Sequence, residues 1–498
     1  MDALSVLFLA ALSDLSSDAA FYRVAQPARH LAERPDVRSV HVTSNLDPNI
    51  DALIEAADVI ILHELADPDL FPKVTAARER GSLVIYDLAH DITSLPTLHP
   101  LQSYWVEEQS QRHAFKLAKL ATMFTASNVR LLSHWAAINP RGNLVADAWP
   151  FEVHATREAS SRFHIAMVVD LHEYAGARDV IGSLLAWMSV TKHATLEVLA
   201  PEIVHQAFAR GPADRMVLST ARDQSDRLAA FRRADVALLA LENSNNAMRL
   251  ADVRWLEAAA SGAVVLAPNL GAYAERITPG ANGILYNEAD EAIPALDRLS
   301  TDPDLLAHVR ATAALQVTDE RQLRASLDEQ VAYWRKFVKR TPDASRAELP
   351  PRLPGTTLPH EHELFEGLLY AGPLNDRSIA RRHFERAAEL LPTSPEPYLL
   401  LARVVPNPIE VVLKAVQLAP KSLRANLLLG DALSDAGQHQ DALAIYQRTA
   451  EFYPAWELPY LRVAMLLEGM GMKAESEQFV RMAAGVATFL EEAIETRG

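Results

Sequence analysis

Residues 254–283 read RWLEAAASGAVVLAPNLGAYAERITPGANG and combine a helix, a buried strand, a glycine loop and an acid in the order that builds a nucleotide site. Good helix formers precede Gly262, which stands where a helix is expected to end. Residues 263–267 form an apolar run typical of a strand buried on both faces, and a second helix is expected from residue 272. Ligands of an open α/β sheet bind at such strand ends, and helix N-termini favour phosphate. We therefore expect a nucleotide here, with the carboxylate of Glu257 accepting both hydroxyls of a ribose.

Apolar runs that suit strands alternate with helical stretches through the first two thirds of the chain. VLFLAAL, VRSVHVT, VIILHEL, SLVIYDL and TMFTAS fall within residues 1–155, and a second series from HIAMVV to ILY falls within residues 156–340. This alternation predicts the α/β class, with two doubly wound domains in succession, each a parallel sheet covered by helices on both faces. Residues 321–340 predict an amphipathic helix whose apolar stripe consists of Leu323, Leu327, Val331 and Trp334.

The last third of the chain has a different pattern. A proline-rich stretch at residues 341–360 predicts an extended linker, and residues 361–498 predict helices only. Pro392, Pro420 and Pro454 end Ala-rich helices there, at separations of 28 and 34 residues. Thirty-four is the tetratricopeptide period, and because the shorter copy lacks six residues, its turn or its first helix must be trimmed. The tetratricopeptide pattern has fixed positions for small and for large side chains. In this chain they are occupied by Ala380, Phe384, Ala387, Leu429, Gly430, Ala442 and Tyr446.

Residues 361–498 therefore resemble tetratricopeptide repeats and are expected to form an all-α solenoid. Stacked repeats leave a concave groove, so we expect this domain to bind a glycan or protein acceptor, to bind a protein partner or to associate with itself. The alternative is a solenoid that packs on the α/β domains of its own chain or forms a homodimer, since an apolar helix stripe by itself reports packing.

Composition limits the classes of partner. With 498 residues, 49% of them hydrophobic, the chain is long enough for two or three cored domains. A formal net charge of −16 argues against nucleic acid, which requires a concentrated basic surface. The absence of cysteine excludes disulfides and suits a reducing cytosol. The N-terminal LSVLFLAAL is too short to span a membrane, so we predict a cytoplasmic protein without a transmembrane segment and leave open a peripheral place at the inner membrane face.

The motif cluster in residues 254–283 resembles the donor-binding half of family 4 glycosyltransferases with the GT-B fold. The matching positions are Arg254, Glu257, Ala258, Ala260, Gly262, Gly271, Glu275, Gly280 and Gly283. The resemblance implies two Rossmann-like domains with a cleft between them and a helix at residues 321–340 that crosses back over the first domain. It also implies transfer of a sugar from a nucleotide sugar, such as a UDP- or GDP-sugar, with retention of anomeric configuration. No cofactor and no metal are expected, because no DxD motif stands where a metal would be needed.

The resemblance also assigns the candidate site residues. On the donor side these are Glu257 for the ribose, Glu275 for the sugar hydroxyls and, for the diphosphate, the amides of Gly271, Ala272 and Tyr273 with Arg249 or Arg254. His172 is a further donor-binding candidate. On the acceptor side, His90 and Asp91 follow the strand SLVIYDL and are the candidate catalytic residues. Tyr22 and Arg23 are further candidates for the cleft, although an Arg on a helix is more often a surface residue. His63 and Glu64 also follow a strand, and we favour a plain loop there over a catalytic role.

Three departures from the family pattern keep alternatives open. The first strand-to-helix turn reads SDLSSDAAF and has no glycine pair, and Arg249 stands where relatives carry an acid. After the first strand of the second domain, relatives supply an Arg and a Lys, whereas this chain provides His172 and Arg178 and no lysine. Arg254 and Glu257 could also be a surface ion pair of a helix, worth only tenths of a kcal/mol. Sugar-nucleotide epimerases share the fold. A second alternative is a non-catalytic or partner-dependent subunit in which the repeats serve as a scaffold.

Overall fold

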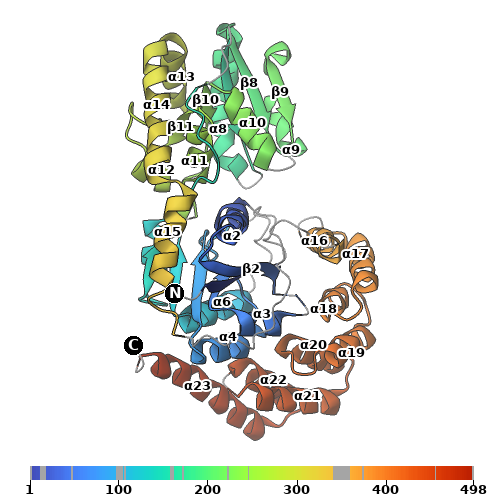
Figure 1. Ribbon diagram of the computed structural model, residues 1–498. Helices are drawn as coiled ribbons and strands as arrows, with labels where there is room; N and C mark the ends of the chain where they lie inside the picture. Colours follow the sequence, from blue (N-terminus) through green and yellow to red (C-terminus); the bar gives the residue numbers. More distant parts are fainter. Residues whose placement is uncertain are drawn as a thin grey trace.

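The computed structural model describes residues 3–11, 18–45, 47, 49–96, 105, 108–156, 162–170, 173–220, 224–244, 246–339, 359–372, 375–454 and 456–495. Three parts are distinct in Figure 1: two α/β domains, one above the other, and a helical domain that curves beneath the first of them. Most of the predicted linker at residues 341–360 lies outside the described residues, and so does His172.

The first domain is a parallel sheet of six strands in the order β2-β1-β3-β4-β5-β6. Its strands are β1 (Leu4–Ala10), β2 (Val37–Ser44), β3 (Val59–His63), β4 (Leu83–Leu88), β5 (Met123–Ala126) and β6 (Gly142–Leu144). Its helices are α1 (Asp18–Ala20), a π-helical turn η2 (Phe21–Ala25), α2 (Gln26–Ala32), α3 (Ile50–Ala56), α4 (Leu70–Glu79), α6 (Glu108–Leu120) and α7 (Val129–Trp135). Alternate side chains of β1 enter different cores, Leu7 on one face and Phe8 on the other, because strand side chains alternate between the faces of a sheet.

The second domain repeats this architecture in the strand order β12-β11-β10-β7-β8-β9. Its strands are β7 (Phe163–Val168), β8 (Ala194–Leu199), β9 (Met216–Ser219), β10 (Val236–Leu238), β11 (Val264–Pro268) and β12 (Ile284–Tyr286). Its helices are α8 (Tyr174–Val190), α9 (Glu202–His205), α10 (Gln224–Arg233), the 3₁₀ turn η6 (Ala247–Arg249), α11 (Val253–Ala260), α12 (Gly271–Arg276), α13 (Ala292–Thr301) and α14 (Pro303–Glu320). Leu238 and Ala237 of β10 again enter cores on opposite faces. The predicted class, two doubly wound α/β domains followed by an all-α part, is confirmed.

Helix α15 (Leu323–Trp334) leaves the second domain and packs on the first. Its buried stripe of Leu323, Leu327, Val331 and Trp334 shares a core with Val6 and Phe8 of β1. Just before this helix, the buried guanidinium of Arg321 donates to the backbone oxygen of Asp147 at 2.7 Å and to the carboxylate of Asp252 at 2.7 and 2.9 Å. Arg321 thus joins the two α/β domains where the chain crosses between them.

The helical domain consists of antiparallel pairs in which each helix packs against the next. Its helices are α16 (Pro359–Ala371), α17 (Arg377–Leu390), α18 (Glu396–Ala402), α19 (Ile409–Leu418), α20 (Leu423–Asp435), α21 (His439–Phe452), α22 (Glu457–Gly469) and α23 (Lys473–Glu495). Helix α18 has seven residues, whereas α16, α20 and α22 have thirteen. Helix α19 has ten residues, whereas α17 and α21 have fourteen, so both helices of the middle copy are shortened.

Gly430 is packed so closely that we expect alanine there to destabilise the protein, whereas helix propensity alone would predict stabilisation. A Cβ on Gly430 of α20 would lie 2.2 Å from Cε1 of Tyr446, whose ring crosses the glycine. We expect Gly430→Ala to destabilise the helical domain by about 1–3 kcal/mol in denaturant unfolding through overpacking, although alanine favours an open helix by about 1 kcal/mol. The control is Gly485→Ala in α23, where an added Cβ meets nothing within 4 Å. Equal stabilisation by both substitutions would contradict the packing.

The helical domain docks on the first α/β domain of its own chain. The ring of Trp456 packs edge-on against Phe71 at 5.1 Å and against His113 at 5.2 Å, and the ammonium of Lys116 lies 4.2 Å from the Trp456 centroid. Lys116 also donates to Glu457. Burial lowers the pKa of His113 to about 4, so its ring is neutral at pH 7. We call this contact, made by Phe71, His113 and Lys116 with Trp456 and Glu457, the solenoid dock.

None of the helices within the described ranges is both long and apolar enough to cross a membrane.

Candidate functional site

Glu257 is a fully buried carboxylate at which three segments of the chain meet. It lies on α11, and its Oε1 accepts a hydrogen bond from the Tyr22 hydroxyl of the first domain at 3.3 Å. The side-chain amide of Gln224, at the start of α10, donates to the same oxygen. Arg254 donates to Oε2 at 3.2 Å, and Arg227 lies 3.8 Å from Oε1. Both oxygens are therefore engaged by cations or by neutral hydrogen-bond donors.

Arg254 is more than the partner of a surface ion pair. Its guanidinium bridges Glu257 and Asp170, donating to Asp170 at 2.7 Å, and its side chain is 11% exposed. Asp170 follows β7, so the bridge lies at the carboxyl end of a strand in the second sheet. This is the edge at which doubly wound sheets bind their ligands.

The glycine loop after β11 packs against η6. Gly271 has a φ of +49°, and a Cβ there would lie 2.5 Å from the backbone oxygen of Ala247. Both facts favour glycine at this position. Tyr273 is buried, which raises the pKa of its hydroxyl, and Ala272 is half-buried. The contact between this loop and η6 brings Gly271 beside the segment that carries Arg249.

Arg249 and Glu275 of the second domain pair with residues of the first. Arg249 forms an ion pair with the buried carboxylate of Asp91, and its backbone oxygen accepts from the side chain of Asn128 at 2.7 Å. Glu275 accepts from Arg130 at 2.6 Å. Four residues of the predicted site are thus brought together in pairs, Glu257 with Arg254 and Asp91 with Arg249, while Glu275 pairs with a residue that the sequence did not single out.

The carboxylate of Asp91 is held in the ionised form. Burial alone would raise its pKa, but hydrogen bonds from Ser94, Thr93 and Arg249 outweigh burial and lower the pKa below its ordinary value. The hydroxyls of Ser94 and Thr93 each donate at 2.6 Å. An ionised Asp91 attracts Arg249 and strengthens the contact between the two α/β domains.

His90 is oriented by Glu64. Its Nδ1 lies 3.0 Å from Oε2 of Glu64, and its backbone amide donates to Oε1 at 2.6 Å. The His90 side chain is 19% exposed, whereas that of Glu64 is buried. Sequence reasoning favoured a plain loop at Glu64, yet this side chain contacts the candidate catalytic histidine directly.

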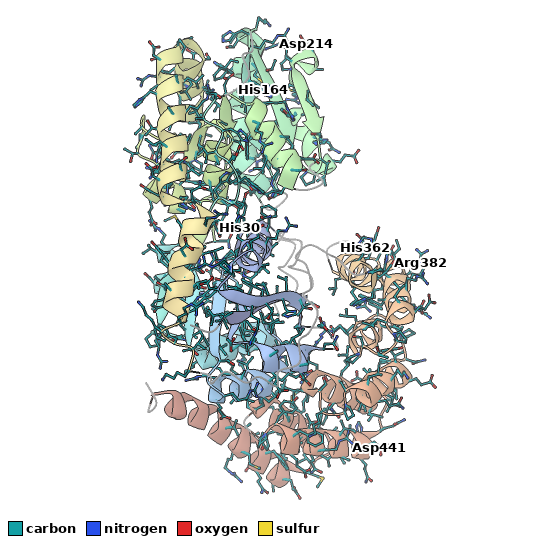
Figure 2. All side chains as sticks on the ribbon, in the orientation of Figure 1. His30, His164, Asp214, His362, Arg382 and Asp441 are labelled. Atoms are coloured by element: carbon teal, nitrogen blue, oxygen red, sulfur yellow. The ribbon has the colours of Figure 1, made fainter. Side chains whose placement is uncertain are left out.

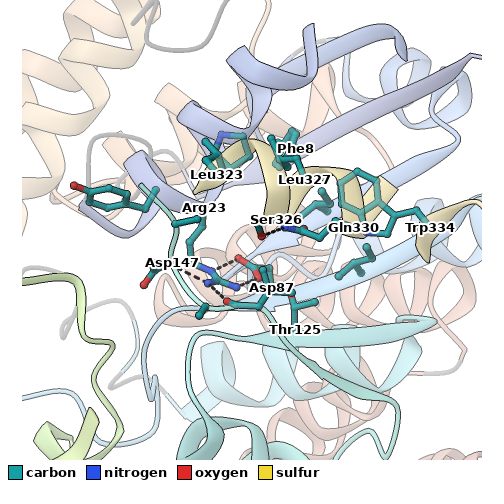
Figure 3. Close-up of a pocket in the computed structure, with 17 residues that line it drawn as sticks. Phe8, Arg23, Asp87, Thr125, Asp147, Leu323, Ser326, Leu327, Gln330 and Trp334 are labelled. Atoms are coloured by element: carbon teal, nitrogen blue, oxygen red, sulfur yellow. Dashed lines mark hydrogen bonds and ion pairs between the residues drawn. The ribbon is translucent and has the colours of Figure 1, made fainter. Parts of the chain in front are cut away.

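Tyr22 and Arg23 are adjacent in the chain, but their side chains contact different residues: Tyr22 contacts Glu257, and Arg23 contacts Asp87. Arg23 lines a pocket between the first sheet and α15 (Figure 3). Its guanidinium donates to Asp87 at 2.5 and 2.8 Å and to Asp147 at 3.1 Å. Thr125 donates to Asp87 as well. One guanidinium thus pairs with two carboxylates, and these contacts join the sheet, η2 and the interdomain segment at Asp147.

Several contacts of the site were missed from the sequence. Asn128 and Arg130 come directly after β5, so the strand-end rule that selected His90 would have selected them too. Gln224 and Arg227 lie on α10, where no motif marks them. They reach Glu257 only because α10 and α11 are neighbours in the fold.

Among the residues that the structure describes, no group of three His, Asp or Glu side chains is placed to hold a metal ion.

Residues 189–330 match a family model described as glycosyl transferase-like. Among solved structures, HepE of Anabaena in complex with UDP and glucose is 15% identical over 67% of this chain and 99% of its own, with a TM-score of 0.49. A glycosyltransferase from Rickettsia africae is 12% identical over 68% and 100%, with a TM-score of 0.49. The sucrose-phosphate synthase of Thermosynechococcus elongatus is 13% identical over 67% and 98%, with a TM-score of 0.47. No curated protein matches the chain. The match shows that residues 189–330, within the second α/β domain, are similar to glycosyl transferases, which confirms the resemblance predicted from Arg254 to Gly283.

Proposed function

We propose that this chain transfers a sugar from a nucleotide sugar, such as a UDP- or GDP-sugar, to a glycan or protein acceptor in the cleft between its two α/β domains. The observation that carries the proposal is the buried carboxylate of Glu257, which lies inside the domain that matches the transferase family. Retention of configuration and independence of a metal are the parts of this proposal that rest on the family resemblance.

The hydrogen bonds at Glu257 support a ribose site. Oε1 accepts from the hydroxyl of Tyr22 and from the amide of Gln224, which are neutral donors of the same kind as sugar hydroxyls. A ribose diol can replace both of them without leaving the carboxylate unpaired in a buried place. Arg254 donates to the other oxygen and positions the carboxylate.

The cations near Glu257 suit a diphosphate leaving group. Arg254 and Arg227 flank the carboxylate, and Arg249 lies on the segment that packs against Gly271. Arginine can neutralise the charge that develops on a diphosphate as the glycosidic bond breaks. In this proposal Arg249 exchanges Asp91 for phosphate, Glu275 exchanges Arg130 for sugar hydroxyls, and His90 and Asp91 face the acceptor.

A second candidate function is favoured by these same pairs. The ion pairs Arg249 with Asp91 and Arg130 with Glu275 link the two domains across the cleft by means of the predicted site residues themselves. A partner-dependent or non-catalytic subunit, in which the helical repeats act as a scaffold, would keep this arrangement permanently.

Nucleotide binding separates the two candidates. We expect the full chain to bind UDP or GDP in titration calorimetry, and Glu257→Gln to weaken binding by about ten- to a hundredfold, because hydrogen bonds to a charged group contribute about 1.5–3 kcal/mol. Tyr22→Phe removes a competing donor but leaves the carboxylate, so we expect unchanged or up to about fivefold tighter binding. Melting temperatures without nucleotide check that both variants fold.

The outcomes then assign the function. Failure of the wild type to bind either nucleotide would support the scaffold, and unaltered binding by Glu257→Gln would place the ribose elsewhere. If binding follows the expected pattern, release of nucleoside diphosphate from a panel of sugar donors distinguishes transfer from binding alone.

A further inference from the structure

We propose that Glu64 is a positioning residue that fixes the ring of His90, and that the helical domain holds Glu64 in place through Asp69. The functional meaning rests on the acceptor-side role proposed for His90. The structural link is the segment 64–69, which joins β3 to α4 and is in contact with His90 at one end and with the helical domain at the other.

At the first end, Glu64 holds His90 with both carboxylate oxygens. Oε1 accepts the backbone amides of Ala89 at 2.7 Å and His90 at 2.6 Å, and Oε2 lies 3.0 Å from Nδ1 of His90. Glu64 has a φ of +45°, a backbone conformation that a glutamate rarely adopts. Such a conformation persists only where the surroundings enforce it, and it concentrates at functional sites.

This contact determines which ring nitrogen of His90 carries the proton. An ionised carboxylate only accepts hydrogen bonds, so Glu64 selects the tautomer with hydrogen on Nδ1 and leaves Nε2 as the basic nitrogen. The negative charge also favours the protonated ring. A general base or acid on the acceptor side needs a defined tautomer and a ring that does not rotate.

At the second end, Asp69 is bound by the helical domain. Its carboxylate accepts the Ser422 hydroxyl at 2.5 Å and the Leu423 amide at 2.6 Å, both at the N-terminus of α20. The Tyr453 hydroxyl lies 3.4 Å away. Burial and the neighbouring Asp67 raise the pKa of Asp69 to about 6, so the carboxylate is mainly ionised at neutral pH. A negative charge at a helix N-terminus is stabilising, and here it secures the segment to α20.

Between the two ends, the segment has little freedom. Leu65 and Ala66 are buried, and the backbone oxygen of Leu65 accepts from Tyr86 at 2.8 Å. Asp67 accepts from Asn45 at 2.7 Å and lies 3.9 Å from Arg424 of the helical domain. A shift of α20 therefore displaces the residues that place Glu64, which links the position of the repeats to His90.

The first test measures the tautomer and the protonation of the His90 ring in the full-length chain by nitrogen NMR of labelled histidine. The His90 signals are assigned as those that are missing from the spectrum of His90→Gln. Glu64→Gln keeps the shape and the acceptor for the backbone amides but presents an amide to Nδ1. We expect the hydrogen to move to Nε2 and the protonation of His90 to shift to lower pH. Glu64→Asn, which tolerates the backbone conformation but cannot reach the ring, should give mixed tautomers. An unchanged tautomer and titration in both variants would overturn the role of Glu64.

Kinetics provide a separate readout. In a transfer assay we expect Glu64→Gln to lower kcat by about ten- to a hundredfold with an altered pH profile, the range typical of residues that orient an active group. Its affinity for UDP or GDP should stay at the wild-type value, because Glu64 lies outside the donor site. A loss confined to KM for the donor would contradict the proposal. If the wild type binds no nucleotide, the proposed transferase function is wrong, but the NMR measurement still tests whether Glu64 fixes the ring of His90.

The second test addresses the helical domain. Asp69→Asn removes the charge at the N-terminus of α20, and we expect it to change the His90 spectrum in the same direction as Glu64→Gln, to a smaller extent. The control is Asp441→Asn, on the outer side of the helical domain (Figure 2), which should leave the spectrum unchanged. A wild-type His90 spectrum in folded Asp69→Asn would overturn the link to the repeats.

Discussion

Replacing Arg23 with methionine is expected to destabilise the first α/β domain by about 3–5 kcal/mol, because two buried carboxylates lose their cation. The side chains of Arg23, Asp87 and Asp147 are 3%, 6% and 2% exposed. The guanidinium also donates to the backbone oxygen of Val145 at 2.7 Å, so the substitution leaves several acceptors unsatisfied in a dry place. Denaturant unfolding of the full chain measures the loss.

The matched control is Arg29→Met, an exposed arginine on α2, which should change stability by less than about 0.5 kcal/mol. Combining Arg23→Met with Asp87→Leu should recover part of the loss, because an apolar pair replaces an unpaired charge. A loss of less than about 1 kcal/mol for Arg23→Met alone would mean that water screens this cluster.

The same cluster gives the sign of the acid dependence. Burial alone would raise the pKa of Asp87, but Arg23 and His63 outweigh burial and hold that pKa below its ordinary value. A carboxyl with a depressed pKa contributes stability above its unfolded pKa of about 4 and loses this contribution as the pH falls further. The wild type should therefore lose stability below about pH 4 more steeply than Arg23→Met.

Replacing Trp456 with alanine is expected to cost about 3–5 kcal/mol at the solenoid dock. Trp456 is buried between Phe71 and His113, and its ring face receives the Lys116 ammonium. The substitution removes an aromatic side chain that no neighbouring residue can replace and weakens the attachment of the helical domain. We expect hydrogen exchange in α4 and α6 to accelerate, and unfolding to separate into two transitions.

Met465→Ala is the control for Trp456→Ala. Met465 lies on α22, the helix that Trp456 directly precedes, and is 62% exposed, so its truncation should leave both stability and exchange close to the wild type. If Trp456→Ala also leaves a single transition at the wild-type position, the two domains are held together by contacts other than the solenoid dock.

The architecture could be predicted because its signals are local. A strand buried on both faces is a continuous apolar run, and β1 is buried at all seven positions. The stripe of α15 is regular, and the proline spacing predicts the shortened copy, in which α18 and α19 are both short. Strand β6 was missed because it has three residues and is partly exposed, so no apolar run marks it.

The candidate site could be predicted only where its residues are close in sequence. Glu257 stood out through its neighbours in the chain, whereas Gln224 and Arg130 reach the site from other elements. Tyr22 and Arg23 show the limit most clearly. They are consecutive in the π-helical turn η2, yet one reaches Glu257 and the other Asp87, and no pattern of residue types distinguishes those directions.

Two ion pairs near the contact between the α/β domains, Arg321 with Asp252 and Arg130 with Glu275, are expected to respond differently to ionic strength. Arg321 and Asp252 are 4% and 10% exposed, whereas Arg130 and Glu275 are 41% and 42% exposed. Dissolved salt screens exposed pairs far more than buried ones. We therefore expect rising ionic strength to weaken the exposed contact between Arg130 and Glu275 and to leave the contact at Arg321 intact, so that the two domains separate first at Arg130.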